Sequence, residues 1–357
     1  MPTLPEQEIP PQSEPVHDSY TAAARAVLSQ TGIVIPVYFP VEGDNAVGYR
    51  LLRETVAACK AHMADATCLC LSVDGEAHGG EIAEELANVH GVQVCVAERN
   101  RGKLQGVRNG MQRLYENEDL RYLGIVDSDG DHFANEIVNL VRTAQYFCDH
   151  VGAGEVLVIG ERTTRHRPMG FLRGELEEVA DRVMMDMLAY HAVVEGQPLR
   201  LEGVTTFGEY PDFHSGFKLY TRGAAAATFL GEPQLCGASE DAYFRHGCES
   251  VMSIEPLLAG AVLALARRST FNEQPVSTFG LLDRDRMVAD KIIWPAKRLG
   301  IPLPFLDQWL RNHLPRLLLN TLAPQGQEEL VTIRRLILDE FEGGQALGDD
   351  LVRPLFL

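Results

Sequence analysis

The chain has 357 residues, of which 45% are hydrophobic and 23% are charged, the balance of a globular protein with a sizeable buried core. Its formal net charge of −18 argues against a general nucleic-acid binder and against broad adhesion to an anionic membrane surface, because both need clustered Lys and Arg. The seven cysteines include no Cys-x-x-Cys pair, which gives no support to a structural zinc site.

The first third of the chain alternates between strand and helix patterns. A Pro-rich, acidic leader at 1–17 precedes a short helical pattern at 19–30. Four apolar, β-branched runs predict buried strands at 31–40, 66–75, 91–98 and 121–131. Three amphipathic stretches predict helices between them at 47–64, 80–89 and 104–115. Because the leader has no apolar signal core and the longest apolar run, 256–266, is too short to span a bilayer, we expect a cytoplasmic protein without a transmembrane segment.

This alternation predicts an α/β fold with a mostly parallel sheet covered by helices on both faces. Ligands of such sheets bind beyond the carboxyl ends of the strands. Polar or turn-forming residues stand at all four of these ends, namely Pro36 to Pro40, Asp74, Glu98 to Lys103 and Asp127 to Asp131. Further along, we expect helices at 137–150, 172–190 and 223–230, strands at 155–162 and 213–222, a helix start at 239–246, and mostly helix from about 283 onward.

Asp127 and Asp129 follow an apolar strand, so their carboxylates leave the sheet together. Hard divalent cations take oxygen ligands, and one or two carboxylates plus substrate phosphates suit Mg²⁺ or Mn²⁺. Asp131 adds a third acid, and His132 beside it is a further ligand candidate. The alternative is a solvated acidic turn, but the polar residues at the other strand ends favour a metal site.

Arg99, Arg101 and Lys103 form the only dense basic patch near these acids, and Gly102 would let the backbone approach a ligand closely. A basic helix start beside a metal site suits a diphosphate, whereas the alternative is a solvated charged loop. Asp74 ends the second strand, where its carboxylate could accept hydrogen bonds from a nucleobase or simply terminate the strand.

Glu240 and Asp241 open a helix after Ser239, which could be its cap. The helix dipole alone would explain both acids. The functional interpretation is that one of them is a general base that deprotonates an acceptor hydroxyl.

The segments PVYFP, SVDG, NRGKLQGVRNG, VDSDGD, GER, SGFKLYTR and SEDAYFRHG, in this order, resemble the family 2 glycosyltransferases of GT-A fold over residues 31–255. The resemblance implies an enzyme, a hexosyltransferase that moves a sugar from a UDP- or GDP-sugar with inversion and uses Mn²⁺ or Mg²⁺. It also implies a GT-A catalytic domain at 31–280, with a nucleotide-binding half at 31–135 and an acceptor half at 136–280. Residues 1–30 would be the leader and short helix, and 281–357 a helical C-terminal region.

By the same resemblance, Asp241 is favoured over Glu240 as the catalytic base, and Asp74 reads the base of the nucleotide. The residues expected to bind the donor are Pro36, Tyr38, Asp74, Arg99, Gly102, Lys103, Asp127, Ser128 and Asp129. The expected metal ligands are Asp127, Asp129 and Asp131, the last standing where related enzymes often carry Gln.

Within the family, the segment DFHSGFK is similar to the D-x-x-S-G-F-R/K pattern of dolichyl-phosphate mannose synthase-like enzymes. The match covers Asp212, Ser215, Gly216, Phe217 and Lys218, while Arg162 matches a G-S-R segment in which Glu161 replaces the small residue. Arg162, Arg165, His166 and Arg167 form a second basic cluster that could hold a phosphate, or could be a solvated loop. His214 and His246 are additional contact candidates.

The chain departs from those relatives in a longer loop after Pro40, the lack of membrane-spanning helices, and a C-terminal region without a recognised counterpart. The acceptor is therefore left open between a lipid phosphate and a small soluble molecule. The C-terminal helices could pack on the domain, form a homodimer, or make peripheral membrane contact. Two alternatives to the transferase are a nucleotidyltransferase and a non-catalytic nucleotide-sugar-binding protein.

Overall fold

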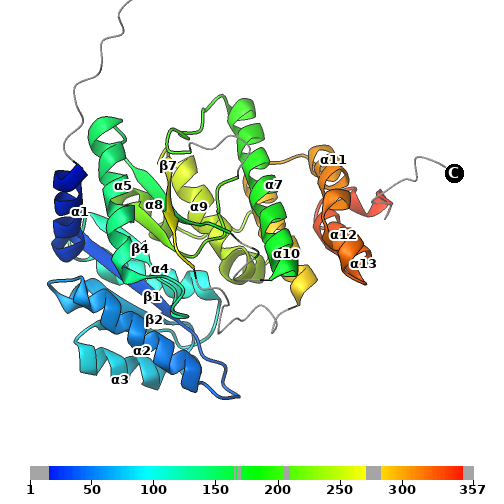
Figure 1. The fold of residues 1–357 in the computed structure, drawn as a ribbon. Helices are drawn as coiled ribbons and strands as arrows, with labels where there is room; N and C mark the ends of the chain where they lie inside the picture. The colour runs from blue at the N-terminus through cyan, green and yellow to red at the C-terminus, as the bar shows by residue number, and fades with distance from the viewer. Residues whose placement is uncertain (1–15, 165, 167–169, 205–209, 271–282, 349–357) are drawn as a thin grey trace, which may run out of the picture.

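The structure, a computed structural model, describes residues 16–164, 166, 170–204, 210–270 and 283–348. Its centre is a seven-stranded sheet of order β3-β2-β1-β4-β6-β5-β7 (Figure 1). The strands are β1 (Thr31–Val37), β2 (Leu69–Val73), β3 (Gln93–Val96), β4 (Tyr122–Ile125), β5 (Val156–Arg162), β6 (Lys218–Thr221) and β7 (Val262–Arg268). All the strand pairs are parallel except those of β6, which runs antiparallel to both β4 and β5.

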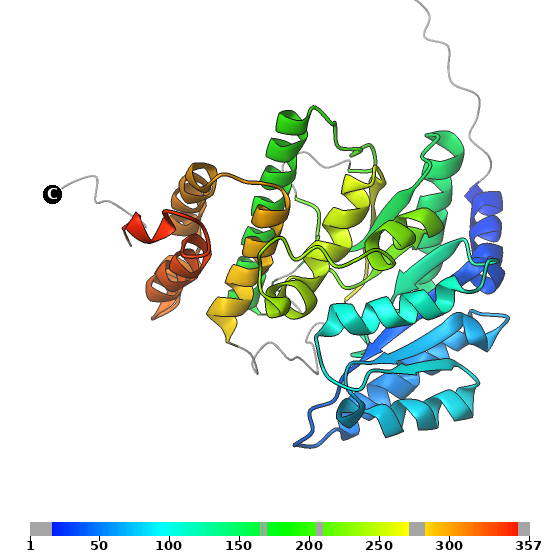
Figure 2. The same ribbon diagram turned by 180° about the vertical axis from the view of Figure 1, so that it is seen from behind.

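Helices cover both faces of this sheet (Figures 1 and 2). One face carries α4 (Lys103–Tyr115), α8 (Arg222–Phe229) and α9 (Cys248–Leu258). The other face carries α1 (Val16–Gln30), α2 (Ala46–Ala61), α3 (Gly80–His90) and α5 (Ile137–His150), with α1 packed along α5. The predicted α/β fold with a mostly parallel sheet between two helical layers is therefore confirmed.

The strands at the centre of the sheet are buried on both sides, as their unbroken apolar sequences require. Every residue of β2 and β4 is buried, and β1 is buried except for the half-buried Pro36. The structure also contains short helical turns: η1 (Ala66–Cys68), η2 (Glu76–His78), η3 (Ala134–Glu136), the π-helical η4 (Asp241–His246), η6 (Leu314–Arg316) and η7 (Gly344–Ala346).

One detail differs from the sequence prediction. The apolar run at 256–266 splits into the end of α9 and the edge strand β7, which the sequence pattern does not predict, and the break falls at Gly260, whose φ is +89°. The helical turn after Ser239, η4, ends at His246 with Gly247 as its C-cap, and α9 begins at the next residue, Cys248. Gly247 donates its amide to the carbonyl of Ala242 (3.0 Å), which closes the π-helical turn.

The described part of the C-terminal region, residues 283–348, is mostly helical, as expected. A long helix, α7 (Phe171–Glu195), packs against α10 (Arg284–Arg298), and α10 in turn contacts α9, η4 and α13 (Gly326–Leu338). The remaining helices are α11 (Leu303–His313) and α12 (Leu319–Leu322). Among the described residues, no helix is both long enough and apolar enough to cross a membrane.

Candidate functional site

The sheet topology brings the predicted site residues to one edge. The carboxyl ends of β1, β2, β4, β5 and β7 lie on the same side of the sheet because these strands run parallel. Because β6 is antiparallel, its amino end, preceded by Ser215 and Gly216, lies on that side too. Lys218 pairs with Ile125 on one neighbour and Ile159 on the other, which places the segment before β6 between the ends of β4 and β5.

The acidic turn after β4, residues Asp127 to Asp131, is held by backbone and side-chain contacts. Asp129 accepts a hydrogen bond from the amide of Asp131 (3.1 Å), and Asp127 donates its amide to Nδ1 of His132 (2.9 Å). Burial, and then the charges of Arg268 and Lys103, hold the pKa of His132 well below its ordinary value. His132 is therefore neutral, and its role here is to accept from the turn.

Asp131 is buried and forms an ion pair with Arg268 from the end of β7 (3.0 Å). Within the described part of the chain, the carboxylates of Asp127, Asp129 and Asp131 do not converge as a ready three-ligand group. The assignment of Asp131 as a third metal ligand stays a prediction, and this geometry favours the other two acids.

Asp127 and Asp129 nevertheless fit a divalent cation. They offer hard oxygen donors from one turn, and such ions often take one or two carboxylates and fill the remaining positions with substrate phosphates. Gly216 packs directly against Asp127: a Cβ at this position would lie closer than 3.0 Å to Oδ2. A larger residue just before β6 would therefore displace the Asp127 carboxylate from this position.

Asp74 holds the basic loop that leads into α4, residues Arg99 to Lys103, in position. Its Oδ1 accepts from the amide of Arg101 (2.9 Å) and its Oδ2 from the amide of Gly102 (2.8 Å). Asp74 is buried, so these two charge-assisted bonds fix the loop at the end of β2. The contact of Asp74 with a nucleobase stays a prediction, and in the structure both of its carboxylate oxygens bind amides of the loop.

Lys103 lies between two acids at the start of α4. Its Nζ is 2.8 Å from Oδ1 of Asp127 and 2.9 Å from Oε1 of Glu249. Burial alone would lower the pKa of Lys103, but Asp127 and Glu249 outweigh it and raise that pKa well above the ordinary value. A permanently charged ammonium therefore stands beside the acidic turn.

The basic loop also contacts the segment that carries the predicted base. Arg101 forms an ion pair with Glu240 (2.8 Å), and its guanidinium lies 4.5 Å from the centre of the Phe244 ring. Asp241 is exposed and pairs with Arg245 (3.1 Å). Ser239 accepts the amide of Ala242 (3.1 Å), as expected of a helix cap.

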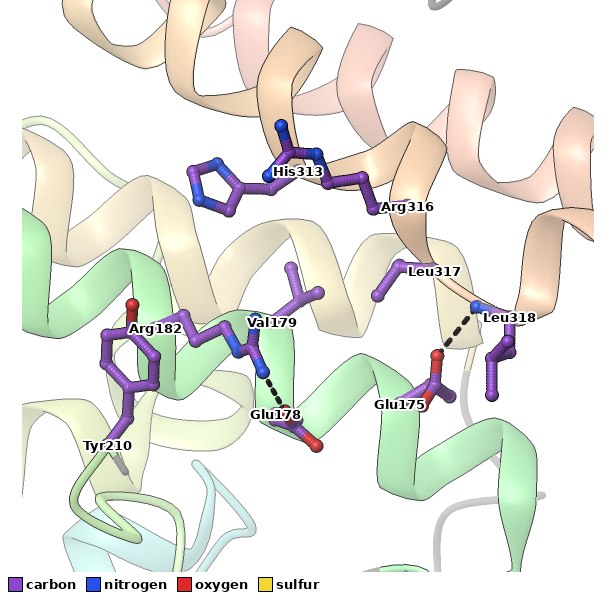
Figure 3. Close-up of a pocket in the computed structure, with 9 residues that line it drawn as sticks. All are labelled: Glu175, Glu178, Val179, Arg182, Tyr210, His313, Arg316, Leu317 and Leu318. Carbon is purple, nitrogen blue, oxygen red and sulfur yellow. Dashed lines mark hydrogen bonds and ion pairs between the residues drawn. The ribbon is translucent and has the colours of Figure 1, made fainter. Parts of the chain in front are cut away.

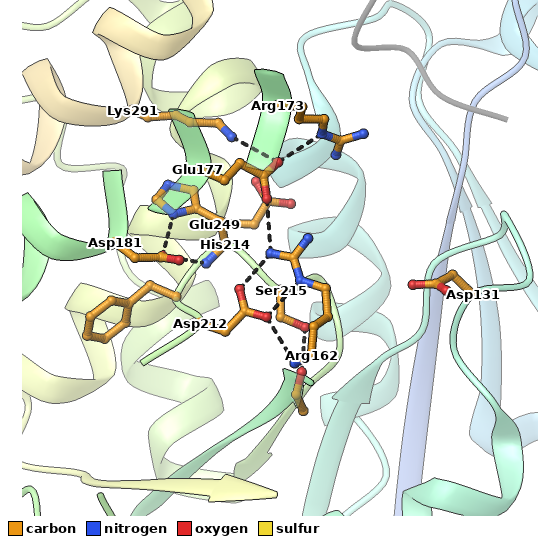
Figure 4. A network of polar contacts seen from close by, with 12 residues as sticks. Asp131, Arg162, Arg173, Glu177, Asp181, Asp212, His214, Ser215, Glu249 and Lys291 are labelled. Atoms are coloured by element: carbon orange, nitrogen blue, oxygen red, sulfur yellow. Dashed lines mark hydrogen bonds and ion pairs between the residues drawn. The ribbon is translucent and has the colours of Figure 1, made fainter. Parts of the chain in front are cut away.

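A buried ionic network lies beside this edge (Figure 4). Arg162 at the end of β5 pairs with Asp212 (2.6 Å) and with Glu177 of α7 (2.9 Å), and Glu177 also contacts Arg173 and Lys291. The contact between Arg162 and Asp212 joins the GER and DFHSG segments, although the two residues are 50 positions apart in the sequence. Because Arg162 is neutralised by these acids, its predicted phosphate contact would require a change of partners.

The other residues of the DFHSG segment are buried. Ser215 donates to the carbonyl of Gly160 (2.6 Å), and His214 contacts Asp181 through Nδ1 (2.7 Å). Lys218 donates to the carbonyls of Phe213 and Ser215, and burial lowers its pKa to about 8. These contacts hold the segment in place rather than offering charges to a ligand.

The remaining predicted residues are more scattered. Tyr38 is exposed at the end of β1 and stacks on His78 with ring centres 4.6 Å apart. Arg99 is exposed and Ser128 is half-buried. His246 pairs with Asp290 of α10 (2.7 Å). Arg165 and Arg167 lie outside the described residues, and the adjacent His166 contacts Glu175 of α7 (3.0 Å), away from the acidic turn.

A hollow of about 340 Å³ lies between α7 and the turn after α11 (Figure 3). Glu175, Glu178 and Arg182 line it from α7, and Arg316 lies on the opposite side. His166, Glu175 and Glu178 bring one ligand atom each within 4.8 Å of one another. Arg182 and the amide of Leu318 already occupy these carboxylates, so the group is not an open cation site.

Sequence reasoning missed three residues of the edge. Glu249 pairs with Lys103, Arg268 pairs with Asp131, and His78 stacks on Tyr38. The signal for Arg268 would have been the strand β7 ending in two arginines, had that strand been predicted. Glu249 follows the SEDAYFRHG segment within two residues, but its contact with Lys103 depends on the fold.

Neither a protein-family model nor a curated protein sequence matches this chain. Among solved structures, glucosyl-3-phosphoglycerate synthase from Mycobacterium tuberculosis, in complex with Mn²⁺ and UDP-glucose, is 14% identical with a TM-score of 0.45, covering 82% of this chain and 86% of that one. The same synthase in complex with phosphoglyceric acid is also 14% identical with a TM-score of 0.45, and the match covers 79% of this chain and 84% of that one. Residues 1–349 of TarS from S. aureus are 12% identical with a TM-score of 0.39, and the match covers 89% of this chain and 90% of that one. At these values the function has to be inferred from the chain's own residues.

Proposed function

We propose that this protein is a metal-dependent glycosyltransferase of GT-A fold that moves a sugar from a nucleotide diphosphosugar to an acceptor hydroxyl or phosphate. The observation that carries the proposal is the meeting, at one sheet edge, of the acidic turn, the basic loop and the Glu240–Asp241 pair. Lys103 contacts the first of these and Arg101 the last, so groups of both signs surround one place. Such a mixed site suits an anionic donor bound through a cation.

The acids and cations have separate roles in this proposal. Asp127 and Asp129 would hold Mn²⁺ or Mg²⁺, which when bound offsets the negative charge of the diphosphate. Lys103 and Arg101 would contact the diphosphate oxygens, with Arg99 nearby on the same loop. Asp74 keeps the loop in position through the amides of Arg101 and Gly102.

Asp241 would take the proton in the transfer step. The acceptor oxygen attacks the anomeric carbon, the bond from this carbon to the diphosphate oxygen breaks, and the nucleoside diphosphate leaves with the bonding electrons. The proton of the acceptor hydroxyl passes to the Asp241 carboxylate. Asp241 is exposed and its carboxylate pairs with Arg245 of the same turn, a long side chain that can move aside, so an acceptor could reach it. An attack from the face opposite the leaving group inverts the anomeric centre.

The test is calorimetric titration of UDP and GDP, with and without Mn²⁺, into the wild-type protein and Asp129→Ala. We expect binding of one nucleotide that requires the cation and falls at least tenfold in the variant, because one of the two carboxylate ligands is lost. Asp119→Ala is the matched control, since Asp119 is an exposed turn acid at the opposite end of β4.

Two results would redirect the assignment. If neither nucleotide binds under any metal condition, the acidic turn is a structural feature and the donor site is wrong. If binding is intact but no sugar nucleotide is consumed, the chain is a non-catalytic nucleotide-sugar-binding protein.

A further inference from the structure

The segment that carries Glu240 and Asp241 has an unusual backbone. Residues Asp241–His246 form a π-helical turn, a rare geometry that occurs frequently at functional sites. The turn closes through the bond from the Gly247 amide to the Ala242 carbonyl (3.0 Å), five residues back. A side chain at position 247 would lie closer than 3.0 Å to this carbonyl oxygen. Such a turn persists only where its surroundings hold it.

Helix α10 supplies three of these surrounding contacts. Asp290 contacts Nδ1 of His246 (2.7 Å), the indole of Trp294 donates to the carbonyl of Gln234 (2.8 Å), and Lys297 donates to the carbonyl of Gly237 (2.9 Å). The three positions are four and three residues apart, so they lie on one face of the helix. This face therefore contacts residues 234–247 both before the catalytic acids and after them.

Asp290 is the most enclosed member of this face. It is fully buried, and its second oxygen pairs with Arg286 (2.8 Å) one turn earlier. Glu340, which follows α13, then pairs with both Arg286 (3.0 Å) and Lys297 (2.9 Å). The charge of Asp290 is thus matched by Arg286, and this pair is tied in turn to the end of α13, so the carboxylate that faces His246 is held in place from two elements.

We propose that α10 is a positioning element of the active site, in which Asp290 holds the π-helical turn through His246 and thereby fixes Asp241 for proton transfer. This inference rests on the proposed function, because it assumes that Asp241 acts as the base. It gives the C-terminal helical region a role in the catalytic step at the acceptor side. Asp290 would act only through His246 and would not touch the substrate.

The first test measures the turn directly. Amide hydrogen exchange in Asp290→Asn should be at least tenfold faster at 239–247 than in the wild type, while residues 101–106 keep their protection. Asp285→Asn, in the first turn of the same helix, is the matched control and should leave 239–247 unchanged. Unchanged exchange at 239–247 in Asp290→Asn would overturn the proposal. Should that variant not fold, Lys297→Met, which removes the contact with Gly237, decides by the same measurement.

The second test asks whether Asp290 acts through Asp241. Release of nucleoside diphosphate from UDP-glucose and GDP-mannose, with water as the acceptor, is measured for Asp290→Asn, Asp241→Asn and the double variant. We expect kcat to fall about tenfold or more in Asp290→Asn with donor KM within twofold, and no further loss when Asp290→Asn is added to Asp241→Asn. If the two losses in kcat multiply in the double variant, Asp290 does not act through Asp241 and the proposed coupling is overturned. An inactive wild type, or an Asp241→Asn variant that keeps the wild-type kcat, would instead refute the proposed function, and the exchange result would still stand.

Discussion

Glu249 is the residue whose contacts are least expected from the sequence. It lies in the first turn of α9, where the helix dipole favours an acid, and it shares Lys103 with Asp127. Burial alone would raise the pKa of Glu249, but Lys103 and Lys218 outweigh burial and hold that pKa below its ordinary value. The Glu249 carboxylate is therefore charged. As a result, Lys103 divides its positive charge between Glu249 and Asp127 instead of pairing with Asp127 only.

We predict that Glu249→Gln weakens cation-dependent nucleotide binding about tenfold. Lys103 would then pair with Asp127 only, and a divalent cation would have to compete with it. Losing one partner of this largely buried pair should also lower the free energy of unfolding by about 1–3 kcal/mol. Calorimetric titration and denaturant unfolding measure the two effects. The control is Glu255→Gln on the same helix, which breaks the pair with Arg298 and should reduce stability without changing nucleotide affinity.

The stability effect has a defined pH dependence. Because the pKa of Glu249 is lower in the folded than in the unfolded protein, its contribution is present above the unfolded value of about 4.5 and is lost as pH falls below it. The difference in unfolding free energy between the wild type and Glu249→Gln should therefore be constant from pH 5 to 7 and shrink in acid. A difference that grows on acidification would contradict the ion pair.

At the scale of single residues, sequence patterns predict the parts that adjoin strand ends. Asp74, Lys103 and Asp127 lie at the edge where the parallel-sheet argument places them. The pattern does not reveal which partners they choose. Asp74 binds backbone amides and Arg162 binds buried acids, because the segments that supply these partners are brought close only by the strand order.

At the scale of elements, the informative strand is β6. The sequence predicts an extended segment there but not its direction. Because β6 runs antiparallel to β4 and β5, the DFHSG segment before it lies at the same end of the sheet as the acidic turn. Strand β7, which the sequence pattern does not predict, likewise brings Arg268 at its end to Asp131 of the acidic turn. Periodicity within a segment carries no information on its neighbours, so the direction and order of these strands could not be predicted from it.

The contact between the basic loop and η4 is also a property of elements, and it depends on Gly102. This residue has a φ of +126°, and a Cβ there would lie closer than 3.0 Å to the Phe244 carbonyl. We predict that Gly102→Ala separates the loop from the turn and lowers the free energy of unfolding by at least about 2 kcal/mol, combining backbone strain with overpacking. Thermal and denaturant unfolding provide the measurement.

Gly43 offers a matched control for this substitution. Its φ of +114° is similar, but a Cβ there would meet nothing within 4 Å. Gly43→Ala should therefore report the backbone strain alone, about 1 kcal/mol. Equal losses in the two variants would mean that packing against Phe244 contributes nothing.

At the scale of the whole molecule, the question is whether the C-terminal helices form a unit of their own. The sequence predicts their helicity but not their packing. In the structure the middle of α10 is buried on all sides: the consecutive residues Ile292, Ile293 and Trp294 are all fully buried, with Trp294 beside Tyr243. Because α10 contacts α7, α9, η4 and α13, removing it would expose this core rather than detach a module.

We therefore predict that the chain unfolds as one cooperative unit. Its only two tryptophans, Trp294 and Trp309, both lie in the C-terminal helices, so their fluorescence reports that region, whereas far-UV circular dichroism reports all the helices. In a guanidinium titration the two signals should change with the same midpoint and the same slope. A fluorescence transition at clearly lower denaturant would mean that the C-terminal helices unfold first as a separate unit, and that the rest of the fold persists without the contacts that α10 makes with η4.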